Sequence, residues 1–463
     1  MIMRPEIGLL PLYLELYDKA MPESRPRIDA FRETILRALE GRGMNVVGAP
    51  VCRVEAEFEA AMRAFEDAGV DAIVTLHLAY SPSLESAGVL SRTKLPLVVL
   101  DTTPTYEYGP DQDPAELMYN HGIHGVQDLC NQLLRHGKPF QIEAGHWEKS
   151  DVLDRVADWA RAARLASLMR NARVGRIGEP FKGMGDFMVP ADTLSAMGIE
   201  VIAADFAELR SLLPAENDGT VGAEMASDLE RFAHEDVDET SHLATTRASL
   251  AVRRWIENNG LTAFTMNFDA IDPSTGIPTV PFLEASKGMA RGIGYAGEGD
   301  VLTAALVGAL ASVYPETSFT EMFCPDWENG TVFMSHMAEM NTDLCAGKAR
   351  LFVKSMPWVP SADPVVAIGR FKAGEATLIN LAPQPGGEFA LIIAPVAAID
   401  VQSEDRVTDL VRGWLRPELP LADFLEAYSM EGGTHHSAII YGDVTEDMVR
   451  FADMMGWKAV VLG

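Results

Sequence analysis

The stretch DAIVTLHL (71–78) decides the fold class of this sequence, and LPLVVL (95–100) repeats its pattern. Both are nearly continuous runs of apolar, often β-branched residues, which are typical of parallel strands buried on both faces. Before the first run, Phe58, Met62 and Phe65 follow one another at helical spacings, so they lie on one face of a helix. This alternation of strand and helix predicts a doubly wound α/β domain.

The same alternation extends over residues 1–170, where it places His77 at the carboxyl edge of the sheet, the edge at which such domains bind ligands. It starts again at residue 171 and continues to residue 313. After residue 314 the pattern changes to strands joined by Gly and Pro turns, as in antiparallel sheets. We therefore expect an α/β fold of three domains: two doubly wound α/β domains, followed by a β-rich, barrel-like C-terminal domain (314–463).

The composition is that of a folded but unusually acidic protein. Of the 463 residues, 48% are hydrophobic, and the net charge is −29. Nucleic acids and anionic membranes repel so acidic a chain, and we expect neither as a partner. The N-terminus has no signal-peptide pattern, no apolar run approaches the roughly 20 residues that span a bilayer, and the four cysteines are scattered. These features predict a cytoplasmic protein.

The segment GIGYAGEGD (292–300) is the first of four in which polar residues interrupt structured sequence. Glu298 lies in a glycine-rich turn there, just before an apolar helix predicted at Val301–Leu310. Judged alone, Glu298 is more simply a helix cap, because carboxylates are favoured at helix N-termini. The glycine spacing also fits a dinucleotide-binding fingerprint, but no parallel strand clearly precedes it, and we reject that interpretation.

The other three segments carry one glutamate and three histidines. Glu321 ends the β-prone run TSFTE, and His336 lies within the apolar run VFMSHM. Taken singly, the glutamate reads as a solvent-facing charge at a strand end, and the histidine as a core residue. The pair His435 and His436 follows two glycines and enters a predicted strand. Because neighbouring residues of a strand point to opposite faces, we expect only one of the two to face a metal.

Two carboxylates and two imidazoles make a mixed oxygen and nitrogen ligand set. Such a set suits Mn²⁺, Co²⁺, Mg²⁺ or Fe²⁺ better than a thiolate site does, and it leaves positions open for two substrate oxygens. Spacing alone does not establish that these residues meet, because more than a hundred residues separate the first from the last.

Six short motifs together resemble bacterial L-arabinose isomerase over nearly the whole chain. The family's segments G-F-G-A-E-G-D, T-S-F-M-E, G-S-H-M-L-E and G-P-H-H-T are similar to GYAGEGD (294–300), TSFTE (317–321), SHMAE (335–339) and GTHHS (433–437). Near the N-terminus, LHLAYSP (76–82) resembles W-L-H-T-F-S-P, and NHGIHG (120–125) resembles N-Q-T-A-H-G. Each motif is weak alone, but all six occur in the family's order.

The resemblance implies a metal-dependent aldose–ketose isomerase. It implies that the Mn²⁺ ligands are Glu298, Glu321, His336 and His436, with Co²⁺ or Mg²⁺ as alternatives, and that both glutamates transfer protons. It also implies a trimer-based oligomer, usually a hexamer, in which His124 reaches the sugar of a neighbouring subunit. We expect the substrate-binding side chains to be His124, His435, His77 and Tyr13.

The segments around the metal motifs depart from the family. After Glu321 the chain reads MFCPDW where the family has D-Y-T-Y-H-F, and the first pocket strand reads LPLYLE (10–15) where the family has G-S-Q-H-L-Y-G. His121 and Gln127 replace a family glutamine and arginine. We therefore expect a sugar other than L-arabinose, such as a hexose, a deoxy sugar or a modified sugar. The alternatives are a non-catalytic sugar-binding or regulatory protein, and a metal-dependent epimerase or hydrolase.

Overall fold

The computed structural model of the chain describes residues 3–400 and 405–463. They form two compact units, an N-terminal unit (Met3–Ser167) and a C-terminal unit that starts at Leu168. In the described ranges, we find no helix that is both long and apolar enough to cross a membrane.

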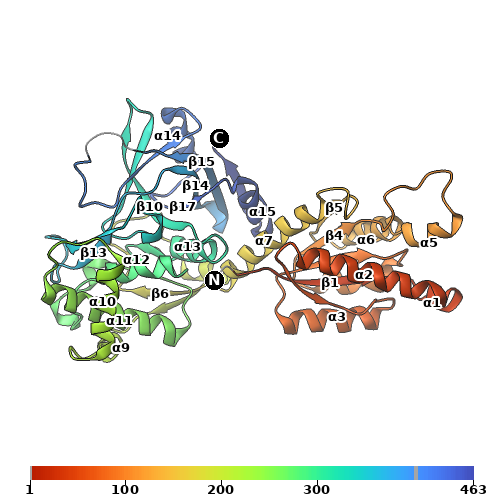
Figure 1. Ribbon diagram of the computed structural model, residues 1–463, viewed down its shortest axis with the longest axis horizontal. Helices are drawn as coiled ribbons and strands as arrows, with labels where there is room; N and C mark the ends of the chain where they lie inside the picture. The colour runs from red at the N-terminus through yellow and green to blue at the C-terminus, as the bar shows by residue number, and fades with distance from the viewer. Residues whose placement is uncertain (1–2, 401–404) are drawn as a thin grey trace. The chain divides into compact units, whose positions relative to one another are not determined.

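The N-terminal unit contains a five-stranded sheet in which every neighbouring pair is parallel, in the order β2-β1-β3-β4-β5 (Figure 1). The strands are β1 (Glu6–Leu12), β2 (Asn45–Gly48), β3 (Ala72–His77), β4 (Leu97–Asp101) and β5 (Gln141–Ala144). The helices are α1 (Glu15–Ala20), α2 (Arg25–Glu40), α3 (Glu55–Ala68), α4 (Ser83–Arg92), α5 (Leu117–Asn120), α6 (Ile123–Arg135) and α7 (Val152–Arg170).

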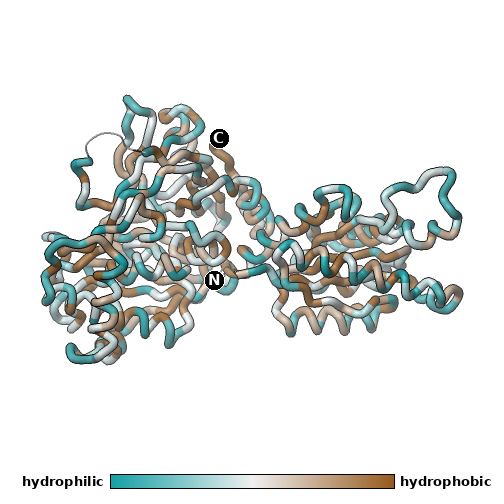
Figure 2. Tube along the Cα trace, viewed as in Figure 1, coloured by the Kyte–Doolittle hydropathy of each residue, from teal (hydrophilic) through white to brown (hydrophobic). Residues whose placement is uncertain are grey.

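This sheet has an apolar core on each face. Ile7 and Leu9 of β1 pack in one core with residues of α2 and α7, whereas Leu10 and Leu12 pack in the other with residues of α3, α4 and α6. Brown, hydrophobic strands with paler or teal loops around them show the same arrangement in Figure 2. Both faces of the sheet are therefore covered by helices, as the continuous apolar runs predict.

The C-terminal unit begins with a second parallel sheet, in the order β7-β6-β8-β9. Its strands are β6 (Arg173–Ile177), β7 (Glu200–Ala203), β8 (Ala263–Met266) and β9 (Gly294–Gly297). Its helices are α8 (Ala191–Met197), α9 (Phe206–Leu212), α10 (Gly219–Arg231), α11 (Glu239–Asn259), α12 (Phe282–Ala290) and α13 (Val301–Val313). The glycine-rich segment expected as a turn thus contains a buried strand, β9, and only Glu298 and Gly299 separate that strand from Asp300, the cap of α13.

The rest of the unit is a closed β-barrel. The ring runs β14-β17-β10-β11-β16-β15 and closes through the pairing of β14 with β15, while β18 adds beside β15. The strands are β10 (Thr317–Asp326), β11 (Thr331–Ser335), β14 (Gly374–Pro383), β15 (Phe389–Ala398), β16 (Gly413–Pro417), β17 (His436–Tyr441) and β18 (Lys458–Val461), and the helices are α14 (Leu421–Met430) and α15 (Thr445–Met455). The predicted fold class, two parallel α/β sheets followed by a barrel, is confirmed.

Two predicted strands of the β-rich region lie outside this ring. β12 (Arg350–Val353) and β13 (Val365–Ile368) pair with each other as a separate antiparallel ribbon. Short 3₁₀ turns complete the chain at Pro22–Ser24, Pro114–Glu116, Phe268–Ala270, Pro273–Thr275, Thr342–Leu344 and Pro385–Gly387.

Helix α13 joins the parallel sheet to the barrel. It is buried along almost its whole length, and it contacts β8 and β9 as well as β10 and β17. Gly294 of β9 permits this close packing, because a Cβ there would lie 2.3 Å from the carbonyl oxygen of Ala304 and 2.4 Å from the amide nitrogen of Gly308. The carboxyl end of β9 is therefore held beside the barrel strands that carry the remaining candidate residues.

Candidate metal centre

Four strands of the C-terminal unit deliver the predicted metal ligands. Glu298 follows the last residue of β9, and His336 follows the last residue of β11. Within the barrel, Glu321 of β10 lies opposite Ser335 on one side and opposite His436 of β17 on the other. This register brings together residues that are far apart in the sequence, which spacing alone could not establish.

Glu298 is held by an unusual backbone conformation. Its φ is 63°, the left-handed region, and among the described residues no other non-glycine residue has a positive φ. Its amide donates a hydrogen bond to Met266, and its carbonyl accepts one from Phe181, at 2.9 and 2.8 Å. Strained backbone of this kind persists where the surroundings enforce it, and it is concentrated at functional sites. The capping role considered for Glu298 belongs instead to Asp300, which accepts from the amide of Thr303.

Each of the three histidines bonds a carboxylate through Nδ1. His336 lies 2.7 Å from Glu339. His436 lies 3.0 Å from Asp300. His435 lies 2.6 Å from Asp186. Because an ionised carboxylate only accepts hydrogen bonds, these contacts place a proton on Nδ1 and leave Nε2 for the other side of the ring. The same orientation is typical of metal-ligating histidines.

The Nε2 atoms face the two glutamates. Nε2 of His436 lies 3.6 Å and Nε2 of His435 lies 3.7 Å from Glu298, and Nε2 of His336 lies 4.0 Å from Glu321. Two overlapping groups result, Glu298–His435–His436 and Glu321–His336–His436, and within each group the ligand atoms lie within 4.8 Å of one another. Ligands of one ion at bonds of about 2.0–2.2 Å are separated by about 3–4 Å, so the donor set fits a divalent cation.

Two further observations support that fit. Nε2 of His435 and Nε2 of His436 are buried and have no hydrogen-bond partner among the described residues. Such atoms are rare in folded proteins unless a water, ion or ligand satisfies them. At Gly297 a Cβ would lie 2.5 Å from Cε1 and 2.8 Å from Nε2 of His336. The absence of a side chain at this position therefore makes room for the imidazole ring.

Aromatic side chains surround the imidazoles. Phe187 stacks on His436 with ring centroids 5.3 Å apart, and Phe319 makes edge contacts with both His336 and His436. The hydroxyl of Tyr295 donates to Glu339 at 2.7 Å. This shell excludes water from one side of the centre and fixes the ring orientations, so charges there interact more strongly than on the surface.

The two glutamates differ in their ionisation. Burial acts to raise the pKa of both carboxyl groups. For Glu298 the neighbouring histidines outweigh burial and hold the pKa below its ordinary value, whereas for Glu321 burial prevails and the pKa is raised. Burial lowers the pKa of His336, but the adjacent Glu339 carboxylate more than compensates and raises it to about 9. Two carboxyl groups with opposite pKa shifts are the arrangement that acid–base catalysis uses.

The expectation that only one of His435 and His436 faces the centre is wrong. β17 begins at His436, so His435 precedes the strand and does not follow its alternation. The two rings lie 4.1 Å apart, and the Nε2 atoms approach Glu298 to nearly the same distance. His435 therefore belongs to the same cluster.

The remaining predicted residues belong to the N-terminal unit. Tyr13 is buried beside Tyr17, and burial raises its pKa to about 12. His77 is fully enclosed, and both ring nitrogens lack a partner among the described residues. His124 is exposed and contacts the ring of Tyr80.

The sequence analysis missed the carboxylates that orient the histidines. Asp300 and Glu339 lie within the quoted motifs, two residues after Glu298 and three after His336, and these short spacings were the available signal. Asp186 offered none, because it lies 249 residues from His435.

These features define the class of protein: a parallel α/β sheet joined to a closed β-barrel, with a candidate cation centre where the two meet. The family described as the L-arabinose isomerase central domain matches residues 194–314, and the L-arabinose isomerase C-terminal domain matches residues 316–458. L-arabinose isomerase 1 of Bacillus licheniformis is 28% identical over 421 residues, which cover 88% of this chain and 82% of that protein.

Other relatives agree. L-arabinose isomerase of Geobacillus thermodenitrificans is 27% identical, over 84% of this chain and 80% of that protein. The protein of the same name from Shouchella clausii is 24% identical, over 98% of this chain and 93% of its own length. The chain belongs to the L-arabinose isomerase family, as a divergent member.

Proposed function

We propose that this enzyme holds a divalent cation, Mn²⁺ in preference to Co²⁺ or Mg²⁺, through Glu298, Glu321, His336 and His436. With that cation it interconverts an open-chain aldose and the corresponding ketose. By its family the chain is a sugar isomerase of the aldose–ketose class. The ligands, the metal and the particular sugar are the proposal.

The observation that carries the proposal is the set of three imidazoles whose Nδ1 atoms bond Glu339, Asp300 and Asp186 and whose Nε2 atoms face Glu298 or Glu321. Carboxylate partners of this kind fix the tautomer of a ligating histidine and increase its basicity. A sugar-binding protein that only used hydrogen bonds would need neither this orientation nor two carboxylates with opposite pKa shifts. The donor set favours hard or borderline cations.

The two glutamates supply the proton transfers. One carboxylate removes the proton from C2 of the aldose while O1 gains a proton, which gives an ene-diol. Return of a proton to C1 and loss of the proton on O2 then give the ketose. When bound, the cation polarises the carbonyl group and stabilises the negative charge that develops on the sugar oxygens. A direct hydride shift from C2 to C1 is the alternative route, and it takes no proton from solvent.

We propose that His435 contacts the sugar and that His124 of a neighbouring subunit reaches it. Tyr13 and His77, which the resemblance also suggested as substrate-binding residues, are buried in the N-terminal unit. Because the sequence around them departs from the family pattern, we propose a hexose, a deoxy sugar or a modified sugar as substrate. We further propose a trimer-based assembly, with a hexamer as the first expectation. We also propose that the second and third domains begin at residues 171 and 314. Finally, we propose a cytoplasmic location, in agreement with the four free cysteines.

The test is a screen of pentoses, hexoses and substituted sugars with chelator-treated protein, before and after addition of Mn²⁺ or Co²⁺. We expect metal-dependent isomerisation of at least one sugar, and its loss in Glu321→Gln. Glu316→Gln, which changes an exposed carboxylate five residues earlier, is the matched control and should stay active. Deuterium incorporation from solvent at C1 or C2 supports the ene-diol route, and hydrolysis or epimerisation without isomerisation would refute the proposal.

A further inference from the structure

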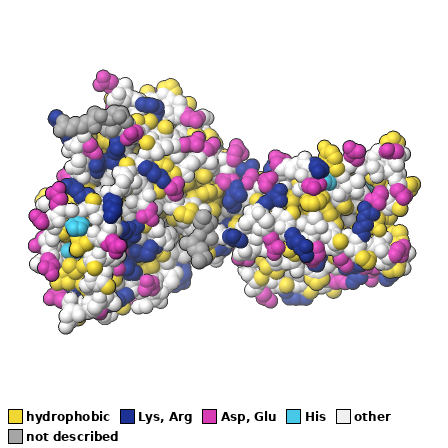
Figure 3. All heavy atoms as spheres, in the orientation of Figure 1, with side chains coloured by type: hydrophobic (Ala, Val, Ile, Leu, Met, Phe, Trp, Pro, Cys, Tyr) yellow, Lys and Arg dark blue, Asp and Glu magenta, His cyan; other side chains and the backbone are white. Residues whose placement is uncertain are grey.

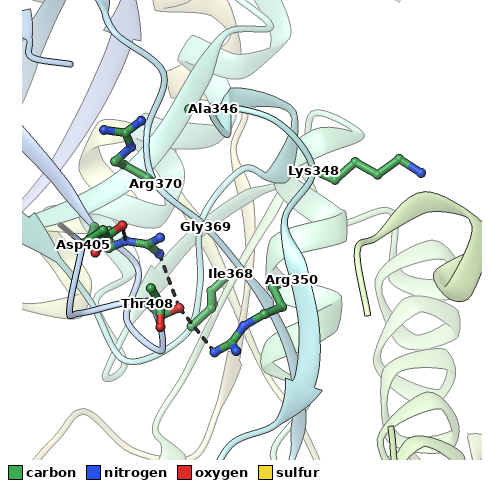
Figure 4. Close-up of a pocket in the computed structure, with 9 residues that line it drawn as sticks. Ala346, Lys348, Arg350, Ile368, Gly369, Arg370, Asp405 and Thr408 are labelled. Atoms are coloured by element: carbon green, nitrogen blue, oxygen red, sulfur yellow. Dashed lines mark hydrogen bonds and ion pairs between the residues drawn. The ribbon is translucent and has the colours of Figure 1, made fainter. Parts of the chain in front are cut away.

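The described residues also enclose a pocket that shares no residue with the candidate metal centre. Its volume is about 430 Å³, within the roughly 300–1,000 Å³ of small-molecule sites. Its walls come from the β12–β13 ribbon and from the segment before β16 (Figure 4). The lining side chains that carry charge are Lys348, Arg350, Arg370, Arg412 and Asp405.

The charge of this region is opposite to that of the chain. Residues 346–372 contain five Lys or Arg residues and one Asp, a net charge of +4, whereas the whole chain carries −29. On the face drawn in Figure 3, by contrast, acidic side chains are spread among the basic ones. A local concentration of cations in an acidic protein attracts small anions, because the field of a recessed site is less screened than that of an open surface.

Two of the four cations lack a carboxylate partner among the described residues. Arg350 donates from one Nη to the carbonyl oxygen of Thr408 at 3.4 Å, and Lys348 donates to the carbonyl oxygen of Glu230 at 2.9 Å. Both acceptors are neutral, so both charges are uncompensated. Figure 4 shows Arg350 directed toward Thr408, whereas Lys348 extends away from the other labelled side chains.

The other two cations are recessed and ion-paired. Arg412 bonds Asp405 through Nε at 2.7 Å, and its side chain is only 11% exposed. Its Nη1 donates to the carbonyl oxygens of Thr408 and Leu410, which leaves Nη2 without an acceptor among the described residues. Arg370 is paired with Asp400 at 3.1 Å and is 23% exposed. Counting both carboxylates, the four cations leave a net charge of +2.

We propose that this pocket binds the phosphate group of a small molecule, with Arg350 and Arg412 as the principal donors and Lys348 at the rim. A guanidinium presents planar, paired N–H donors that match phosphate oxygens. A small anion reaches the recessed Arg412, whereas a flat protein surface reaches only the exposed Lys348 and Arg350. The recessed position of Arg412 therefore favours a small ligand over an acidic patch of a second copy.

The experiment is titration calorimetry of the full-length protein at low ionic strength with inorganic phosphate, with glucose 6-phosphate and with glucose. We expect both phosphates to bind with affinity that falls as salt is added, and glucose not to bind at this site. Tighter binding of glucose 6-phosphate identifies a phosphate ester as the ligand, and equal binding identifies phosphate itself.

Charge-removing variants locate the binding. Arg350→Ala is expected to weaken phosphate binding at least tenfold and Lys348→Ala severalfold, while Arg63→Ala, which removes an exposed arginine of α3, leaves it unchanged. Melting temperatures identify any variant that fails to fold, and the rim variant Lys348→Ala then carries the test. Absence of phosphate binding, equal binding by all variants, or a change of oligomeric state in Arg350→Ala without phosphate binding would overturn the proposal.

Discussion

Replacing Gly297 with alanine tests whether the His336 ring needs the space that a residue without a side chain provides in β9. The new Cβ would lie 2.5 Å from Cε1 and 2.8 Å from Nε2 of the ring, whereas ordinary contact begins near 3.4 Å. The ring must therefore retreat by about 0.9 Å, the difference between 3.4 and 2.5 Å. Gly297 does not have a positive φ, so alanine adds no backbone strain and the effect comes from the ring alone.

The ring has little freedom to retreat. Its Nδ1 atom is hydrogen-bonded to Glu339 at 2.7 Å, and the ring makes an edge contact with Phe319 at a centroid distance of 4.8 Å. Metal–ligand distances tolerate only about 0.2 Å of error, so we expect cation affinity to fall by about 10- to 100-fold. Overpacking should also cost about 1–3 kcal/mol of unfolding free energy.

Calorimetric titration of chelator-treated protein with Mn²⁺ measures the affinity, and urea unfolding measures the stability. Gly222→Ala is the matched control, because its Cβ in α10 meets nothing within 4 Å. If Gly297→Ala binds Mn²⁺ as tightly as the unchanged protein, the ring is not a ligand or is not held where these contacts indicate, and the reasoning is refuted.

Three other changes test the candidate site and the burial of His77. Asp300→Asn should weaken Mn²⁺ binding about 10- to 100-fold in calorimetry with little loss of stability, because the carboxylate oxygen that orients His436 is lost while the amide oxygen can still cap α13; unchanged affinity would exclude the orienting role. Glu321→Gln should lower kcat by about 10²- to 10⁴-fold with little loss of stability, and full activity in a steady-state assay would exclude it from proton transfer. Burial lowers the pKa of His77 to about 3, so its neutral form stabilises the fold fully above pH 6.5, and this stability is lost as pH falls toward 3. Between pH 6.5 and 5 the free energy of unfolding, measured by urea titration, should fall by about 2 kcal/mol. His77→Phe should make this free energy less dependent on pH, and an equally steep decrease in the variant would contradict the role given to His77.

The parallel sheets could be predicted from the sequence because a strand buried on both faces requires a continuous apolar run. A strand such as β3 must be apolar at consecutive positions, and this is visible without knowledge of its neighbours. Closure of the barrel produces no local sequence pattern, because it depends on β14 pairing with β15 while β17 pairs with both β14 and β10. The separation of β12 and β13 from the ring could not be predicted for the same reason.

In the candidate site, too, some features could be predicted from the sequence and others could not. The sequence motifs singled out Glu298, Glu321, His336 and His436, and the structure brings their side chains together, although their role as ligands stays a prediction. The orientation of His435 differs from the prediction, because β17 and its alternation of side chains begin only at His436. Partners such as Asp186 depend on tertiary contacts alone.

The position of β17 has a consequence for synthesis of the chain. This strand lies between β14 and β10 in the ring, and it begins with His436, after all other strands of the ring in the sequence. A nascent or truncated chain that stops before this residue has an open barrel with two unpaired strand edges, and it lacks the imidazole shared by both candidate metal groups. The centre is therefore completed only after synthesis has passed His436, so chains that stop before this residue do not acquire the full site.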